Sequence, residues 1–166
     1  MKHIKKINEV WDGQPLSWNR IDNNSTTDYF FTSSTIEYKV EIDNVGDDIY
    51  DIYHFKFYRK DNGIWITDKL TDKNNNNSQK FISISTIGDI FRDFFSNIKY
   101  DAIIYSSLKS EESRIKLYNS VAGLILSKYG GLYFNEDSKY VKYYVHYFDL
   151  KIKNFIMKNY KEYIKN

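Results

Sequence analysis

Two runs of residues with period-two alternation constrain the fold of this chain more than any other feature. Over residues 36–43, IEYKVEID, apolar and charged side chains alternate. After the turn-rich sequence DNVGDD, the run IYDIYHFKFYRK places Tyr53, Phe55 and Phe57 on one face. Such alternation is typical of strands with one buried face. The two runs predict neighbouring antiparallel strands with an acidic connection between them.

From Thr86 onwards, apolar residues recur with the spacing of a helix. The preceding FISIS alternates and predicts a short strand. Thr86, with Asp89 three residues later, resembles a capping box, so we expect a helix over residues 87–97. Its buried face is predicted to consist of Ile87, Ile90, Phe91, Phe94 and Phe95.

The second half of the chain continues with a strand, a helix, aromatic strand material and a closing helix. DAIIYSS has an unbroken apolar core, which favours a strand in the middle of a sheet. The next helix is predicted over 111–129, with Ser110 as its cap and Gly130-Gly131 as its end. LYFNEDSKYVKYYVHYF then predicts strands, and the last eighteen residues predict an amphipathic helix.

These elements predict an α+β fold with a mainly antiparallel sheet and the order β-β-β(-β)-α-β-α-β-α. Two helices would pack on the sheet, and an amphipathic helix would close the chain. The first 28 residues lack sustained periodicity and carry the only proline, so we expect an N-terminal arm over 1–28 and one α+β domain over 29–166.

Composition excludes several classes of protein. The chain of 166 residues contains no cysteine, which removes disulfides and thiolate chemistry and fits a cytoplasmic location. It has no apolar run of the roughly 18 residues that would indicate a membrane span, so no membrane partner is expected. The net charge of +2 is too small to indicate a nucleic-acid partner by itself.

The C-terminal residues form a basic tail on a chain whose remaining residues are slightly acidic, with a net charge of −2. Residues 151–166 hold five lysines and one glutamate, a net charge of +4. Lys158 and Lys161 are the members that we single out as candidate binding residues. Three roles stay open for this helix, namely a solvated basic face, a contact to a nucleic-acid backbone, and docking to a protein partner.

The junction between the DAIIYSS strand and the helix at 111–129 is the best candidate binding site. A helix that begins after a central strand presents free N–H groups to an anion, and Ser106, Ser107, Lys109 and Arg114 cluster around this point. The alternative is a capped helix with Arg114 paired to Glu111 or solvated.

No catalytic or metal-binding pattern is present in the sequence. The seven glycines form no phosphate-binding loop, so no cofactor is predicted. His3, His54 and His146 lie far apart without metal-ligand spacing, and the latter two are expected to be structural. The acidic residues of DNVGDD predict a solvated turn rather than a cation site.

One set of positions resembles small uncharacterised bacterial and phage domains of unknown function. These share a Y-x-F-x-T start, a T-x-x-x-I-x-x-x-F helix, and a strand followed by S-R-x-x-L-Y, and the match covers roughly residues 29–131. The matching positions are Tyr29, Phe31, Thr32, Thr86, Ile90, Phe94, Ser113, Arg114, Leu117 and Tyr118. The resemblance implies no established activity.

A wider resemblance is to the core of the Gcn5-related N-acetyltransferases. The order of strands and helices is similar, and Leu117-Tyr118 ahead of Gly130 looks like the end of a helix in that core. The family binds its cofactor pyrophosphate with a Q/R-x-x-G-x-G/A loop. The corresponding SISTIGDIF has one glycine, Gly88, followed by Asp89, so the resemblance implies the topology without the cofactor loop.

From these observations we predict a non-catalytic binding protein with a protein partner, or a homo-oligomer, in bacterial or phage conflict such as defence, anti-defence or toxin–antitoxin systems. Two alternatives stay open. One is an acetyltransferase-like enzyme that uses acetyl-CoA at the Gly88 junction. The other is a nucleic-acid or nucleotide binder that uses Lys109, Arg114 and the lysine-rich C-terminus.

Overall fold

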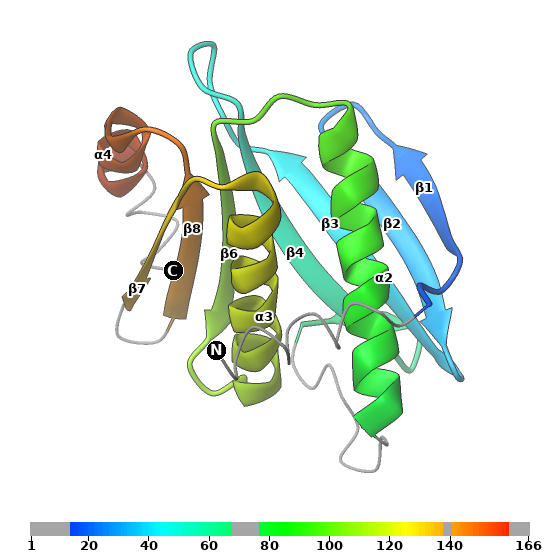
Figure 1. Cartoon of the computed structure of the whole chain (residues 1–166). Helices are drawn as coiled ribbons and strands as arrows, with labels where there is room; N and C mark the ends of the chain where they lie inside the picture. The colour runs from blue at the N-terminus through cyan, green and yellow to red at the C-terminus, as the bar shows by residue number, and fades with distance from the viewer. Residues whose placement is uncertain (1–13, 68–76, 138–140, 160–166) are drawn as a thin grey trace. The chain divides into compact units, whose positions relative to one another are not determined.

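The computed structural model describes residues 14–67, 77–137 and 141–159 (Figure 1). The elements in chain order are β1 (Trp18–Asp22), β2 (Thr26–Ser33), β3 (Ile36–Asn44), β4 (Ile52–Asp61), β5 (Ile64–Ile66), α2 (Asn77–Ser96), β6 (Ala102–Leu108), α3 (Glu112–Tyr129), β7 (Leu132–Asp137), β8 (Val141–Tyr147) and α4 (Leu150–Asn159). The predicted α+β class is confirmed.

The strands form one sheet in which hydrogen-bonded neighbours follow the order β1-β2-β3-β4-β6-β8-β7, and β5 pairs with β4. The pairs β1–β2, β4–β5, β6–β8 and β7–β8 are antiparallel. The pair β4–β6 is parallel, and α2 lies between these two strands in the chain. A parallel pair requires such a crossover, because a tight turn can join only antiparallel neighbours.

The chain divides into two compact units that interleave along the sequence. Unit 1 comprises the described parts of residues 1–42 and 56–98, and unit 2 comprises those of residues 43–55 and 99–166. Unit 1 thus contains β1, β2, most of β3, the second half of β4, β5 and α2. Unit 2 contains the first half of β4 together with β6, α3, β7, β8 and α4.

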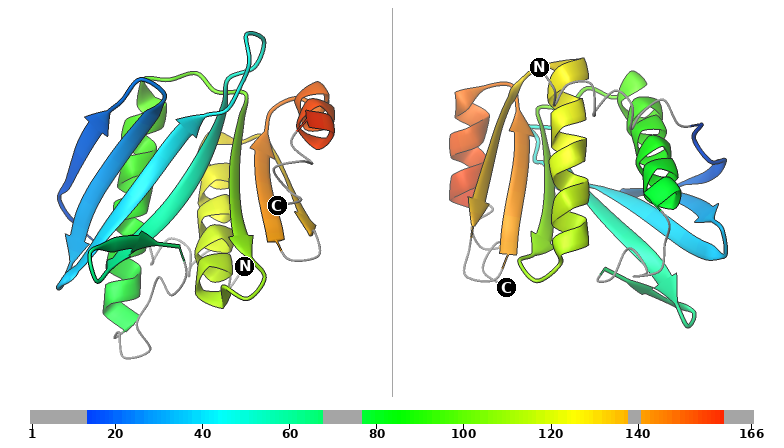
Figure 2. Two further views of the ribbon diagram at one scale, coloured as in Figure 1. Left: turned by 180° about the vertical axis from the view of Figure 1, so that it is seen from behind. Right: turned by 60° about the horizontal axis from the view of Figure 1, so that its bottom comes forward.

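In unit 1, α2 covers one face of β2 and its neighbouring strands (Figures 1 and 2). The predicted apolar stripe of α2 is confirmed, since its members from Ile87 to Phe95 are buried. They lie over an aromatic layer in which the ring of Tyr38 stacks on Phe31 and Phe57, with centroid distances of 5.2 and 5.7 Å. This layer forms the core of the unit.

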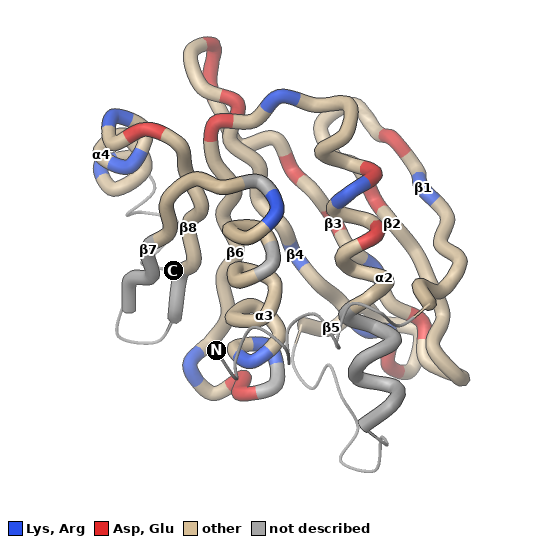
Figure 3. Tube along the Cα trace, viewed as in Figure 1, with Lys and Arg blue, Asp and Glu red and all other residues tan. Residues whose placement is uncertain are grey.

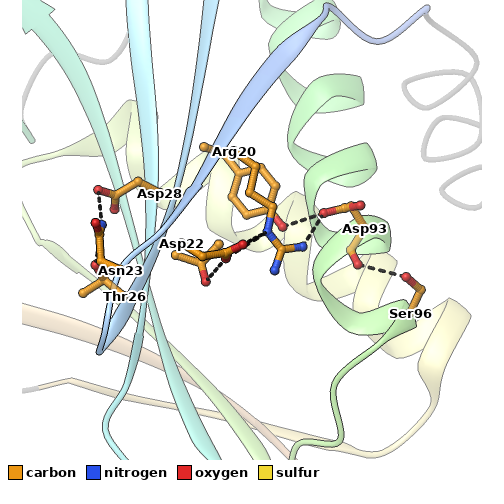
Figure 4. Close-up of polar contacts among 9 residues, drawn as sticks. Arg20, Asp22, Asn23, Thr26, Asp28, Asp93 and Ser96 are labelled. Carbon is orange, nitrogen blue, oxygen red and sulfur yellow. Dashed lines mark hydrogen bonds and ion pairs between the residues drawn. The ribbon is translucent and has the colours of Figure 1, made fainter.

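Strand β1 is held to α2 by charged and aromatic side chains rather than by apolar burial (Figure 4). Arg20 forms an ion pair with Asp93 at 3.0 Å, and the Tyr29 hydroxyl donates a 2.7 Å hydrogen bond to the same carboxylate. The Trp18 indole donates to Asp89 at 3.0 Å. Of the residues predicted as an N-terminal arm over 1–28, Trp18–Asp22 form β1, and the last three belong to β2.

In unit 2, α3 and α4 cover opposite faces of the strands, as the two views in Figure 2 show. On the α4 face, Ile152 and Ile156 pack against Ile104 and Val145 in a buried cluster. On the α3 face, Tyr118 contacts the ring of Tyr105, with a centroid distance of 5.0 Å. The alternation of neighbouring residues between the faces confirms the prediction that β6 is buried on both sides.

The start of α2 corrects the sequence prediction. The helix begins at Asn77 rather than at 87, so FISIS is helical and not a strand. Thr86 lies in the middle of the helix, where its hydroxyl accepts a 2.9 Å hydrogen bond from the Leu16 amide instead of capping. A run of only five alternating residues is compatible with a strand and with a helix. FISIS is helical because it forms part of a long helix that continues to Ser96.

Among the residues described, no helix combines the length and apolar character that crossing a bilayer requires.

Candidate functional site

The parallel pairing of β4 with β6 ends in the middle of both strands. Its register runs from Ile52 opposite Ala102 to Phe55 opposite Tyr105. Beyond that point β6 continues to Leu108 and stays paired with β8 on its other side. The carboxyl ends of parallel strands, where pairing stops, are the usual location of ligand sites in sheets with crossover helices. Functional side chains are therefore expected at this end of the pair.

A histidine and a serine meet at this position. His54 is the last but one paired residue of β4, and Ser106 follows the last paired residue of β6. The His54 Nε2 lies 3.5 Å from the Ser106 Oγ, and both side chains are partly buried, so they remain open to solvent on one side. This separation is at the long end for a hydrogen bond, as is common for catalytic pairs before substrate binds.

The His54–Ser106 pair can accept and relay a proton. Histidine is the residue that most often serves as a general base, and a hydroxyl within reach can pass a proton to it. The structure brings Ser106, one of the predicted binding residues, next to His54, which was not predicted as one of them. A binding role for Ser106 stays a prediction.

The opposite face of β6 is a closed aromatic core. The rings of Tyr105 and Tyr144 stack at 5.2 Å, and Tyr118 and Tyr133 contact Tyr144. Burial, reinforced by the neighbouring phenols, raises the pKa of Tyr105 well above its usual value, so its hydroxyl stays protonated. Ser107 points to the same face and is 2% exposed. Ser107 is therefore positioned for packing, whereas Ser106 faces solvent.

Arg114 and Glu111 form a buried ion pair at the start of α3. The Glu111 Oε2 accepts hydrogen bonds of 2.8 Å from both Arg114 Nη1 and the Leu108 amide. The side chains of Arg114 and Glu111 are only 7% and 4% exposed. Glu111, rather than the predicted Ser110, occupies the capping position. The sequence left open whether Arg114 belongs to an anion site or pairs with Glu111. In the structure it pairs with Glu111.

The remaining predicted binding residues do not converge on one place. Lys109 is exposed in the turn between β6 and α3, close in sequence to the Arg114 pair. Lys158 is exposed in the last turn of α4, and Figure 3 shows other basic positions on this helix. Lys161 lies outside the described residues. A binding role for these lysines stays a prediction.

Gly88 and the acidic turn are not ligand sites in the structure. Gly88 lies in the interior of α2, where helix amides already bond to carbonyl groups one turn earlier, so acetyl-CoA cannot be held at a Gly88 junction as one alternative required. Asp47 accepts hydrogen bonds from the amides of Ile49 and Tyr50, as in a solvated turn. Within the described ranges, no group of three or more metal-ligating side chains is present.

His146 of β8 is buried beside the C-terminal end of α3. Its Nε2 donates to the Gly130 carbonyl oxygen, and the ring packs against Tyr100 and Phe148. The nitrogen Nδ1 has no hydrogen-bond partner among the described residues. Burial, only partly offset by the bond to Gly130, lowers the pKa of His146 below 6.5. A proton on Nδ1 would be a buried donor without an acceptor.

The folded protein is therefore expected to lose stability as the pH falls below about 6.5. Because the unfolded chain protonates His146 at a higher pH than the folded chain does, the free energy of unfolding falls between the unfolded and folded pKa values. Urea denaturation at pH 7.5 and at pH 5 measures this change. His146→Gln is expected to show a smaller difference between the two pH values; an equal difference in both proteins would contradict the assignment.

The topology of the chain is similar to that of a known fold. A mostly antiparallel sheet with one parallel pair, β4–β6, joined by a helix is similar to the core of the Gcn5-related N-acetyltransferases. Neither a protein-family model nor a curated protein matches the chain.

Two solved structures are similar to the chain. One is the N-acetyltransferase PseH of Campylobacter jejuni, with a TM-score of 0.45 and 14% identity, covering 88% of this chain and 75% of PseH. The other is the spermidine N-acetyltransferase SpeG of Vibrio cholerae, with a TM-score of 0.46 and 11% identity, covering 88% of each chain. Both are enzymes, and on this comparison the prediction of a non-catalytic binding protein is wrong.

Proposed function

We propose that the chain is an N-acyltransferase that moves an acyl group from a coenzyme A thioester to an amine, with His54 as the general base. The observation that carries this proposal is the His54–Ser106 pair at the point where the parallel strands β4 and β6 cease to pair. The proposal places the reacting amine at the solvent-facing side of this pair.

The chemistry requires a base but no nucleophile from the protein. The amine nitrogen forms a bond to the thioester carbon, the carbon–sulfur bond breaks, and the thiolate leaves and takes up a proton. The amine must lose one proton in return. The Ser106 hydroxyl accepts it while giving its own proton to His54 Nε2, 3.5 Å away. His54 then gives up this proton, which reaches the thiolate through solvent, so that the overall products are an amide and a free thiol.

The described part of β6 offers one element that fits an acyl-CoA. The backbone groups of Ser106 and Ser107 that point away from β8 are paired with no strand among the described residues. The amide and the carbonyl group of Leu108 are already hydrogen-bonded to Glu111 and do not belong to this open edge. An open strand edge can hold an extended amide-containing chain by main-chain hydrogen bonds, and the pantetheine arm is such a chain. When bound, the thioester supplies the activated acyl carbon.

We further propose that the enzyme works in the cytoplasm. The chain has no cysteine that an oxidising compartment could pair, and its proposed donor is an intracellular metabolite. Expression of the chain with its own amino terminus, followed by fractionation of the cells, would test the location.

The enzyme proposal is tested by binding and by thiol release. We expect acetyl-CoA to raise the melting temperature, since a ligand at one hundred times its Kd adds about 2.7 kcal/mol of stability. Desulfo-CoA, which keeps the nucleotide and the pantetheine amides but lacks the thioester, serves as a control for binding without the acyl group. Because the chain has no cysteine, a thiol reagent reports free CoA without a protein background. If millimolar acetyl-CoA produces no stabilisation and no amine-dependent thiol release, the proposal is refuted.

A further inference from the structure

Unit 1 contains a cavity of about 480 Å³ that is separate in sequence from the His54–Ser106 pair. It lies beside the β2–β3 hairpin and is lined by residues of β1, β2, β3 and β5. The lining residues that matter for recognition are Asn19, Phe30, Thr32, Glu37, Tyr38 and Trp65. The volume is within the range of about 300–1,000 Å³ that is usual for small-molecule sites.

The cavity combines aromatic rings with one carboxylate. Phe30 and Trp65 contact each other with a centroid distance of 5.8 Å and form one wall. Among the described residues of the lining, Glu37 is the one that carries a charge, and its side chain is 52% exposed. The other polar side chains are neutral and can accept hydrogen bonds, namely those of Ser17, Asn19, Thr32 and Tyr38. Such a lining complements a positively charged ligand rather than an anion.

The protein's own lysines show that these groups attract cations. The Lys60 Nζ lies 2.8 Å from the Glu37 Oε2 and 5.6 Å from the centroid of the Trp65 ring. Lys60 and Trp65 are direct partners across the β4–β5 pair, so the ammonium is held there by the register of the hairpin. Lys39 lies 6.0 Å from the same ring. Aromatic rings and carboxylates bind ligand ammonium groups in the same way.

Lys60 leaves room for a second cation. Its bond uses one oxygen of Glu37, and a carboxylate can accept about four hydrogen bonds through its two oxygens. The ion pair is partly exposed, with the Lys60 side chain 35% exposed, so it is weak and exchangeable. A ligand ammonium can share the carboxylate or displace Lys60 from it.

We propose that this cavity binds a small organic ammonium ion, with its charge against Glu37 and its carbon chain against Phe30 and Trp65. Lys60 acts as an internal competitor for the same carboxylate and ring. The proposal does not rest on the acyltransferase activity, because all of its residues belong to unit 1.

The test is an NMR titration of the 15N-labelled chain with n-butylammonium, followed at the Trp65 indole N–H, which Trp65→Phe identifies. We expect saturable shifts with n-butylammonium and none with the neutral n-butanol or the anionic butyrate. Equal shifts with butanol would indicate a merely apolar cavity and would overturn the proposal, as would preferential binding of butyrate.

Charge variants give the sharper result, because two of them are expected to act in opposite directions. Glu37→Gln should weaken n-butylammonium binding by about two- to fivefold, and Lys60→Met should strengthen it by a similar factor. Lys56→Met is the matched control, since Lys56 pairs with Glu41 and does not line the cavity. Far-UV circular dichroism verifies folding. Weaker binding by Lys60→Met than by Lys56→Met would refute the competitor role.

Discussion

Arg114→Ala is expected to lower the free energy of unfolding by about 3–5 kcal/mol, because it leaves the Glu111 carboxylate buried without its counter-charge. Glu111 has little access to solvent and already accepts a hydrogen bond from the Leu108 amide, so it cannot turn outwards without breaking the start of α3. Urea denaturation at pH 7.5 measures the loss.

Two further variants separate this pair from an ordinary surface pair. The double variant Glu111→Gln/Arg114→Met removes both charges and should recover much of the stability, since replacing a buried pair by uncharged groups is often nearly neutral. Arg92→Ala breaks an exposed pair with Asp89 and should cost about 0–1 kcal/mol. A cost below 1 kcal/mol for Arg114→Ala would show that the pair is solvated.

His54→Ala is expected to lower the rate of acyl transfer by about 10²- to 10⁴-fold, which is the usual contribution of a general base. The loss should lie in the chemical step, because the proposed donor contacts are made by the backbone of β6. Stopped-flow or steady-state thiol release with a fixed amine measures the rate. The stabilisation by acetyl-CoA should stay unchanged.

Chemical rescue distinguishes a base from a structural residue. Added imidazole should restore part of the activity of His54→Ala, because it can take up the same proton. Ser106→Ala should lose less activity than His54→Ala, since water can replace a relaying hydroxyl. If His54→Ala retains a rate within threefold of the unmodified chain, His54 is not the base.

The sequence was sufficient to predict the strands and helices whose apolar pattern and end points are set by their own residues. The alternation from Ile36 reflects one buried face of β3. In β4, Phe55 and Phe57 are buried on the face that the sequence predicted, and Ile52 is buried on the other. Helix α3 ends at Tyr129, as Gly130-Gly131 indicated, because both glycines adopt positive φ angles of 69° and 90°. Local chemistry was sufficient in these places.

Elements that depend on distant partners could not be predicted. Most of β1 is exposed, so it shows no apolar pattern, and its pairing with β2 and the ion pair of Arg20 with Asp93 hold it in place. The amino-terminal part of α2 has a sequence that fits a strand equally well. In both cases tertiary contacts outweigh the local preference.

The candidate site depends on a register that no local pattern reveals. His54 and Ser106 lie 52 positions apart, and only the parallel alignment of β4 with β6 brings them together. Arg114 and Glu111, in contrast, are three residues apart on one helix, and their pairing could be anticipated. Sequence spacing therefore detects the structural pair more readily than the functional one.

The interleaving of the two units has a consequence for how the protein is made. Residues 43–55 belong with residues 99–166, so the first half of β4 leaves the ribosome before β6 exists as a partner. Unit 1, by contrast, has all its strands and α2 once residue 98 has emerged. During synthesis, the strand half that carries His54 is thus left with an open edge until the rest of its unit has been translated.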